Sequence, residues 1–74
     1  MYEVDTRELK IAMAEAGFDT FIAFADAADL DRNTVSGVIK GVIYPSSMVM
    51  VKMAEALKLP SERCGRIFFK QKLA

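Results

Sequence analysis

Residues 21–41 of the chain read FIAFADAADLDRNTVSGVIKG and predict two short helices joined by a tight turn. Ala25 is small enough to lie where two helices cross. Asp29, four positions later, belongs to the few residue types besides glycine that tolerate a left-handed backbone. Asp31 follows at the position of a helix cap. The side chains expected to point inward are Leu30, Val35 and Val38.

Residues suited to capping precede each expected helix. In chain order they are Asp5, then Asp19 or Thr20, then Asp31, then Ser46 or Ser47, with Pro60–Ser61 restarting the chain before the last helix. Gly17 and Gly41 are expected at the ends of the first and third helices, because glycine adopts a left-handed backbone easily. The residue before Pro45 is pushed to extended geometry, so a helix cannot continue there.

Apolar residues at helical spacing give each helix one expected buried face. They are Leu9, Ala12, Met13 and Ala16 in the first helix; Phe24, Ala25 and Ala28 in the second; Val35, Val38, Ile39 and Val42 in the third; Met50, Met53, Ala54 and Leu57 in the fourth; and Cys64, Ile67 and Phe68 in the last. We see no strand pattern, repeat or linker. The sequence predicts a compact, all-α, five-helix domain over residues 1–74.

Composition narrows the classes of function. The chain has no His and a single Cys64, which excludes an internal disulfide and predicts neither a metal site nor a cofactor. No phosphate-cradling glycine loop or positioned base is evident, so we expect no catalytic residues and no small-molecule substrate. No apolar run approaches the ~18 residues that cross a membrane. The polar, acidic N-terminus is unlike a signal peptide, which predicts a cytoplasmic protein that is complete as written.

The formal net charge of zero hides an uneven distribution. Residues 1–31 carry eight acids and two bases, whereas residues 32–74 carry eight bases and two acids. A balanced total argues against strong nonspecific affinity for phosphate. The basic part, from Arg32 onward, can still face a DNA duplex; the alternative is an ordinary solvated mixture of charges.

A set of short motifs occurs in a characteristic order: Phe24-Ala25, Asp29-Leu30-Asp31, Thr34-Val35-Ser36, Gly41, Pro45-Ser46 and Met53-Ala54-Glu55-Ala56-Leu57. In this order they resemble the Cro and phage-repressor type (XRE-like) helix-turn-helix family, with the helix-turn-helix unit at about residues 20–41. The opening MYEVDTRELK and the closing Ile67-Phe68-Phe69 also look like small regulators from prophages of Gram-positive bacteria. The resemblance covers about residues 5–69.

This resemblance implies that the second helix of the unit enters the major groove of double-stranded operator DNA. The positions implied to contact DNA are Thr20, Arg32, Asn33, Thr34, Ser36, Gly37 and Lys40. Their chemistry suits the role, since Arg can bind guanine, Asn can bind adenine, and hydroxyls can reach phosphate or base. The alternative is that Arg32, Asn33 and Thr34 form only a polar first turn.

The chain departs from the family pattern in the first helix of the unit. Phe21 replaces the glutamine common at that position, Ile22 and Ala23 follow where polar residues are usual, and Asp26 adds a negative charge. Phe21 also fits the buried face of its helix. In the fourth helix Met48, Val49 and Val51 fall outside the expected buried face, which indicates either a contact surface or a few tolerated surface apolars.

Two functions remain open at this stage. The first is a Cro-like transcriptional regulator in a lysis–lysogeny type switch, which would form a homodimer through its fourth or fifth helix, with Leu73, Phe68 or Phe69 as candidates for the dimer contact. The second is an antirepressor that keeps the fold but binds a partner repressor protein and blocks its DNA binding. The interface residues expected for the second function are Phe21, Ile22, Asp26, Met48, Val49, Val51 and Phe69.

Overall fold

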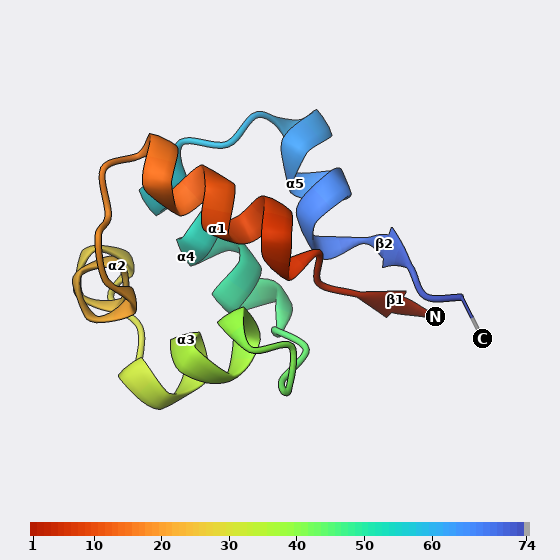
Figure 1. The fold of residues 1–74 in the computed structure, drawn as a ribbon, viewed down its shortest axis with the longest axis horizontal. Helices are drawn as coiled ribbons and strands as arrows, with labels where there is room; N and C mark the ends of the chain where they lie inside the picture. Colours follow the sequence, from red (N-terminus) through yellow and green to blue (C-terminus); the bar gives the residue numbers. More distant parts are fainter. Residues whose placement is uncertain (74) are drawn as a thin grey trace.

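The structure is a computed structural model that describes residues 1–73, which form five helices and one short two-stranded ribbon (Figure 1). The helices are α1 (Thr6–Glu15), α2 (Phe21–Ala28), α3 (Arg32–Ile39), α4 (Ser47–Leu57) and α5 (Ser61–Phe68). The predicted compact, mostly helical domain is confirmed. Across residues 1–73, no helix combines the length and the hydropathy needed to span a membrane.

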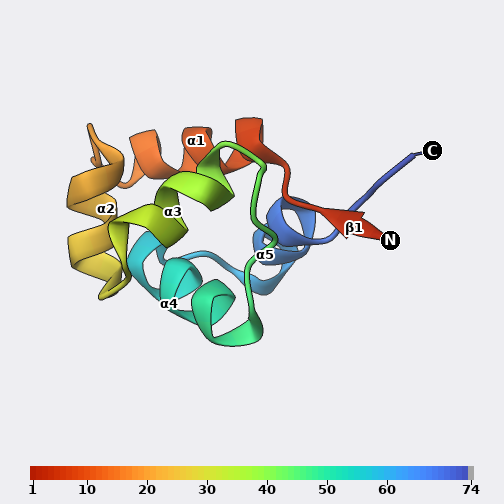
Figure 2. The same ribbon diagram turned by 90° about the horizontal axis from the view of Figure 1, so that it is seen from below.

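The ribbon pairs the two ends of the chain, β1 (Tyr2–Glu3) with β2 (Lys70–Gln71), antiparallel. It lies at the opposite end of the molecule from α2 (Figures 1 and 2). The expectation of no strand is therefore wrong in this detail. Strands of two residues are too short to produce an alternating pattern. The ends are brought together by tertiary contacts instead, among them a hydrogen bond from the Asp5 N–H to the Ile67 carbonyl at 2.7 Å.

Side-chain caps begin the first four helices, as expected. The side-chain oxygens of Asp5, Thr20, Asp31 and Ser46 accept hydrogen bonds from N–H groups in the first turns of α1 to α4. Where the sequence left two candidates, the caps are Thr20 and Ser46. The fifth helix begins after Pro60 without a side-chain cap.

The same left-handed motif closes α1, α2, α3 and α4. The left-handed residues are Gly17, Asp29, Gly41 and Lys58. After each of them, the next N–H bonds to the carbonyl five residues earlier, as Leu30 does to Ala25 at 2.9 Å. Asp29 was predicted from the sequence; Lys58 was not, because lysine has no side-chain chemistry that favours this backbone.

The core gathers apolar residues from all five helices and the N-terminal segment. Its members are Val4, Leu9, Ala12, Met13, Phe24, Ala25, Ala28, Val35, Val38, Val49, Met53, Leu57, Ile67 and Phe68. Cys64, expected as a small core residue, is half-buried against this cluster. Ala16 and Val42 were expected in it and are exposed. Each lies beyond the last turn of its helix, so the helical spacing no longer directs it inward.

The buried face of α4 also differs from the expected one. Val49, Met53 and Leu57 are buried, whereas Met50 and Ala54 are half-buried. The buried residues follow an i, i+4, i+8 row, which is rotated relative to the expected face. Because α4 is apolar nearly all round, its sequence alone did not select between the two faces. Packing against α2 selects this one.

Replacing Lys58 by glycine tests the strain at the end of α4. We expect Lys58→Gly to raise the free energy of unfolding by up to about 1 kcal/mol, since glycine removes the left-handed penalty but adds entropy to the unfolded chain. Glu55→Gly, inside the same helix, is the matched control and should lower the free energy of unfolding by about 1 kcal/mol. Urea unfolding followed by circular dichroism measures both. Destabilisation by Lys58→Gly would contradict the assignment of strain.

Tyr44 links the α3–α4 connection to the end of α5. Its hydroxyl donates a hydrogen bond to the Phe68 carbonyl at 2.6 Å. Burial of the phenol, with a smaller contribution from nearby Tyr2, raises the pKa of Tyr44. A raised pKa means that the fold favours the neutral phenol. This stabilisation is therefore present below the ordinary tyrosine pKa of about 10 and is lost as the pH rises through the raised value.

Tyr44→Phe removes this hydrogen bond together with the titratable hydroxyl. At neutral pH we expect a loss of at most about 1 kcal/mol of unfolding free energy, because the side chain is partly exposed. Above about pH 10 the variant should lose less stability than the wild type. Urea titrations at neutral and alkaline pH measure this difference. Tyr2→Phe is the control, and an equal alkaline effect there would argue against the assignment to Tyr44.

Candidate nucleic-acid interface

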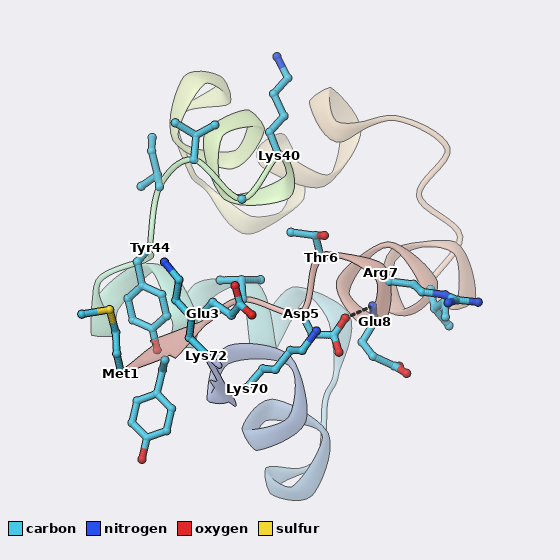
Figure 3. A pocket seen from close by; sticks show the side chains of 16 residues that line it. Met1, Glu3, Asp5, Thr6, Arg7, Glu8, Lys40, Tyr44, Lys70 and Lys72 are labelled. Atoms are coloured by element: carbon cyan, nitrogen blue, oxygen red, sulfur yellow. Dashed lines mark hydrogen bonds between the residues drawn. The ribbon is translucent and has the colours of Figure 1, made fainter. Parts of the chain in front are cut away.

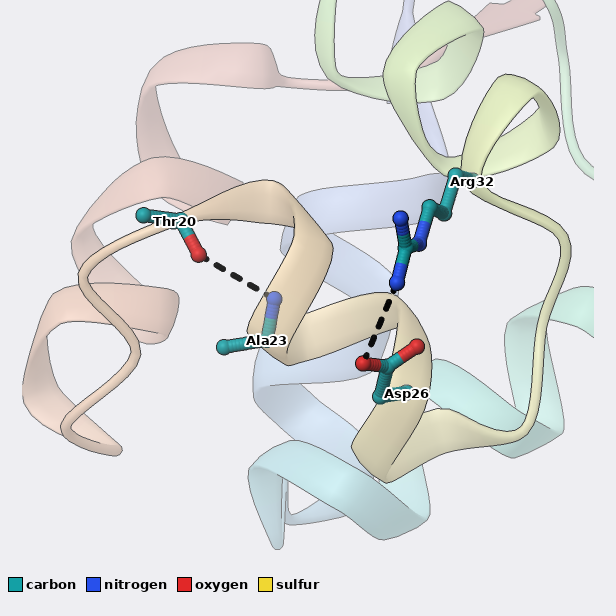
Figure 4. Close-up of polar contacts among 4 residues, drawn as sticks. All are labelled: Thr20, Ala23, Asp26 and Arg32. Carbon is teal, nitrogen blue, oxygen red and sulfur yellow. Dashed lines mark hydrogen bonds and ion pairs between the residues drawn. The ribbon is translucent and has the colours of Figure 1, made fainter.

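The segment between α2 and α3 has a closely defined backbone. Thr20 Oγ1 accepts a hydrogen bond from the Ala23 N–H at 3.1 Å and starts α2 (Figure 4). Asp29 then turns the chain at φ 55° and ψ 49°. Asp31 Oδ2 accepts hydrogen bonds from the N–H groups of Asn33 and Thr34, at 2.9 and 3.1 Å, and starts α3. The relative placement of α2 and α3 is thereby fixed by local bonds at both sides of the turn.

One face of α3 is buried and the other carries most of the predicted DNA-contacting residues. Val35 and Val38 are fully buried. Arg32, Asn33 and Lys40 are exposed, and Thr34, Ser36 and Gly37 are half-buried. The structure thus places six of the seven predicted positions on or beside one helix, with Thr20 at the start of its packing partner α2.

Two of the predicted positions, Gly37 and Lys40, have different structural surroundings. Lys40 follows the last residue of α3, about 12 Å along the helix axis from Arg32. Gly37 lies under the side chain of Ile43, and a Cβ atom there would approach Ile43 Cγ1 to 2.7 Å. The Gly37 carbonyl also accepts hydrogen bonds from Val42 and Ile43. Gly37 therefore allows the chain to fold closely against the end of α3.

Arg32 is paired with an acid from the neighbouring helix. Its Nη2 lies 3.6 Å from Asp26 Oδ2, and the two side chains are 59% and 64% exposed (Figure 4). Sequence reasoning had assigned these residues to different surfaces, Arg32 to a DNA interface and Asp26 to a protein interface. The structure brings them together because the turn at Asp29 folds α3 back against α2.

Lys52 is a member of this region that the sequence analysis missed. From α4, its Nζ donates a hydrogen bond to the Asp29 carbonyl at 3.2 Å and lies 3.7 Å from Asp29 Oδ2. The positive charge thus lies against the turn between α2 and α3. The two residues are 23 positions apart, so no local sequence pattern could have paired them.

The apolar residues predicted for a protein interface fall into two groups. Phe21 and Ile22 are each 39% exposed at the start of α2, so the alternative that Phe21 belongs to the core is wrong. Met48, Val51 and Phe69 are also exposed. Val49 is only 8% exposed, and its assignment to an interface is therefore corrected: it belongs to the buried row of α4.

The opposite end of the molecule contains the residues considered for a dimer contact. Phe69 packs edge-on against Tyr2, with ring centroids 5.4 Å apart, and both stay substantially exposed. Leu73 is exposed as well. Phe68 is 1% exposed and is a core residue, so it cannot form a contact with another molecule. At this junction Phe68 points inward and its neighbour Phe69 outward.

A groove of about 840 Å³ lies between β1, the start of α1 and the α3–α4 connection (Figure 3). Side chains of both charges line it: Glu3, Asp5, Glu8, Arg7, Lys40, Lys70 and Lys72. In Figure 3, Lys40 is directed away from the acids. Within residues 1–73, no group of three or more His, Cys, Asp or Glu could hold a metal ion. The groove thus has mixed charge and no set of residues that converges on one point.

Comparison with known proteins adds no relative: no protein-family model, curated protein or solved structure matches the chain.

Proposed function

We propose that this protein is a small cytoplasmic helix-turn-helix regulator of the Cro type, which binds operator DNA with α3 as the recognition helix. The observation that carries the proposal is the exposed first turn of α3. Arg32 and Asn33 project from a helix whose other face is anchored in the core by Val35 and Val38. A rigid helix that presents such side chains at its N-terminal end is the geometry that helix-turn-helix proteins use in the major groove.

The side chains available suit this role. Arg32 has the donors for a guanine edge, and Asn33 can make a pair of hydrogen bonds to adenine. The oxygen of Thr20 is used as the cap of α2, but its O–H can still donate to a phosphate. Lys40, directly after the last residue of α3, can bind a second phosphate. The direct base contacts thus come from the first turn of α3, and the phosphate contacts come from Thr20 at the start of α2 and from Lys40 at the end of α3.

Electrostatics predict weak sequence-independent binding. Residues 19–40 carry four acids and two bases. A phosphate backbone near α2 and the turn would meet Asp26 and Asp29, which repel it. Affinity must then come largely from correct base contacts and from two copies binding together at sites about one DNA turn apart. Exposed Phe69 and Leu73 are the residues we propose for that homodimer contact.

Binding to DNA is tested by selecting duplexes of about 20 base pairs from a random pool and measuring affinity by fluorescence anisotropy. The combined change Arg32→Ala and Asn33→Ala should weaken binding to the selected duplex at least about tenfold, since each base contact contributes about 1–3 kcal/mol of discrimination. Affinity should also fall between about 50 and 200 mM salt.

Arg66→Ala is the matched control for charge, since it removes one positive charge from the exposed side of α5. It should change affinity less than Arg32→Ala alone. Circular dichroism checks that each variant is folded. A folded wild-type protein that selects no duplex, or variants that bind as tightly as the wild type, would refute DNA recognition by α3.

A second function is favoured by one specific observation, the exposure of Phe21 and Ile22 in the first turn of α2. In an antirepressor these apolar side chains would dock on a partner repressor, and the acids Asp26 and Asp29 would meet the partner's basic DNA-reading face. The exposed Met48 and Val51 of α4 would enlarge this contact, and flexible methionine side chains suit it.

The combined change Phe21→Gln and Ile22→Glu distinguishes the two functions. If the protein is a regulator, it should still select the same duplex, because the base contacts are assigned to α3, while the negative charge added beside Thr20 lowers the overall affinity. If the protein is an antirepressor, it should abolish complex formation with a partner repressor in size-exclusion chromatography. Met48→Gln, on α4, is the companion variant and should weaken the same complex less.

A further inference from the structure

Asp26 and Arg32 face each other across the turn between α2 and α3, with their nearest polar atoms 3.6 Å apart (Figure 4). Both side chains are mostly exposed, so water and an incoming ligand can reach both groups. Within residues 1–73, neither side chain takes part in a hydrogen bond or in a second ion pair. Within that part of the chain, Arg32 is therefore the one charged partner of the Asp26 carboxylate.

The other acids near Arg32 are already engaged. Asp31, its neighbour in the sequence, has one carboxylate oxygen bonded to the N–H groups of Asn33 and Thr34. Asp29 is paired with Lys52 of α4. Asp26, Asp29 and Asp31 thus each have a distinct partner. Asp26 is the one that holds the side chain we assign to base recognition.

We propose that Asp26 is an internal competitor of DNA for Arg32. This inference rests on the proposed function. A guanidinium has five N–H donors in one plane, and a two-point contact with a phosphate or a guanine edge uses two of them. While Nη2 of Arg32 faces Asp26 Oδ2, fewer of these donors are free for DNA. The ion pair must open when α3 enters the groove, and the measured affinity is lowered by the stabilisation that is lost.

The size of the effect follows from the exposure of the pair. Ion pairs between exposed side chains contribute little, so breaking this one reduces affinity by about twofold to fivefold. Asp26 thus adjusts the affinity of the α3 surface and does not switch it on or off. The competition acts only through Arg32, which separates it from general repulsion between the Asp26 charge and DNA phosphates.

A double-mutant cycle measures this distinction. The four proteins are the wild type, Asp26→Asn, Arg32→Ala and the double variant, and the probe is the duplex selected above, labelled with fluorescein. With Arg32 present, Asp26→Asn should lower Kd by about twofold to fivefold. With Arg32 replaced by alanine, the same change should lower Kd by a smaller factor, the part that comes from general repulsion between the Asp26 charge and DNA phosphates. If the Arg32→Ala proteins bind too weakly, the cycle is run at about 50 mM salt.

The control for net charge is Glu62→Gln. It removes one negative charge from α5, which packs against α1 and β2. Its effect on Kd is subtracted from that of Asp26→Asn. Circular dichroism verifies the fold of all variants.

Two results would overturn the inference. Equal gains in affinity with and without Arg32 would show that Asp26 acts by general repulsion. A loss of affinity on Asp26→Asn would show that Asp26 orients Arg32 for binding. Both results require a wild-type protein that binds the selected duplex, so they leave the proposed function standing. Absence of any duplex binding would refute the proposed function and this inference together.

Discussion

The left-handed backbone of Asp29 is the constraint on which the α2–α3 unit depends. A single residue at φ 55° ends α2 and redirects the chain within three positions, so that α3 packs against α2. The carbonyl groups left over at the end of α2 are bonded by the N–H groups of Asp29 and Leu30. Lys52 then ties the turn to α4. Local backbone geometry and one long-range contact together fix how α3 is presented.

The charges around this unit are organised by that same turn. Because α3 folds back on α2, the acid Asp26 meets the base Arg32, and Asp29 meets Lys52. Asp26 and Asp29 would each repel DNA if they were isolated charges, but these pairings partly neutralise them within the molecule. The exposed apolar side chains Phe21 and Ile22 have no such internal partner. The regulator we propose uses the exposed first turn of α3, whereas the alternative antirepressor uses the apolar start of α2 together with Asp26 and Asp29.

The helix boundaries could be predicted best from the sequence, because caps and left-handed residues form hydrogen bonds with groups only a few positions away. Asp31 is an example: its carboxylate bonds to the two N–H groups directly after it. The face of α4 was less accessible. Val49 and Met50 are both apolar, and periodicity cannot decide between neighbours when nearly every position is apolar. The ribbon β1–β2 was not accessible at all, because two-residue strands carry no periodicity.

The sequence by itself determined the five helices, the starts of the first four at side-chain caps, the left-handed turn at Asp29 and the inward direction of Val35 and Val38. These features are local, and each depends on residue types only a few positions apart. Only the tertiary structure decided that Arg32 pairs with Asp26, that Lys52 holds Asp29, that Val49 is buried and that Phe21 is not. Those outcomes depend on how the helices pack, and packing joins residues whose separation along the chain follows no period.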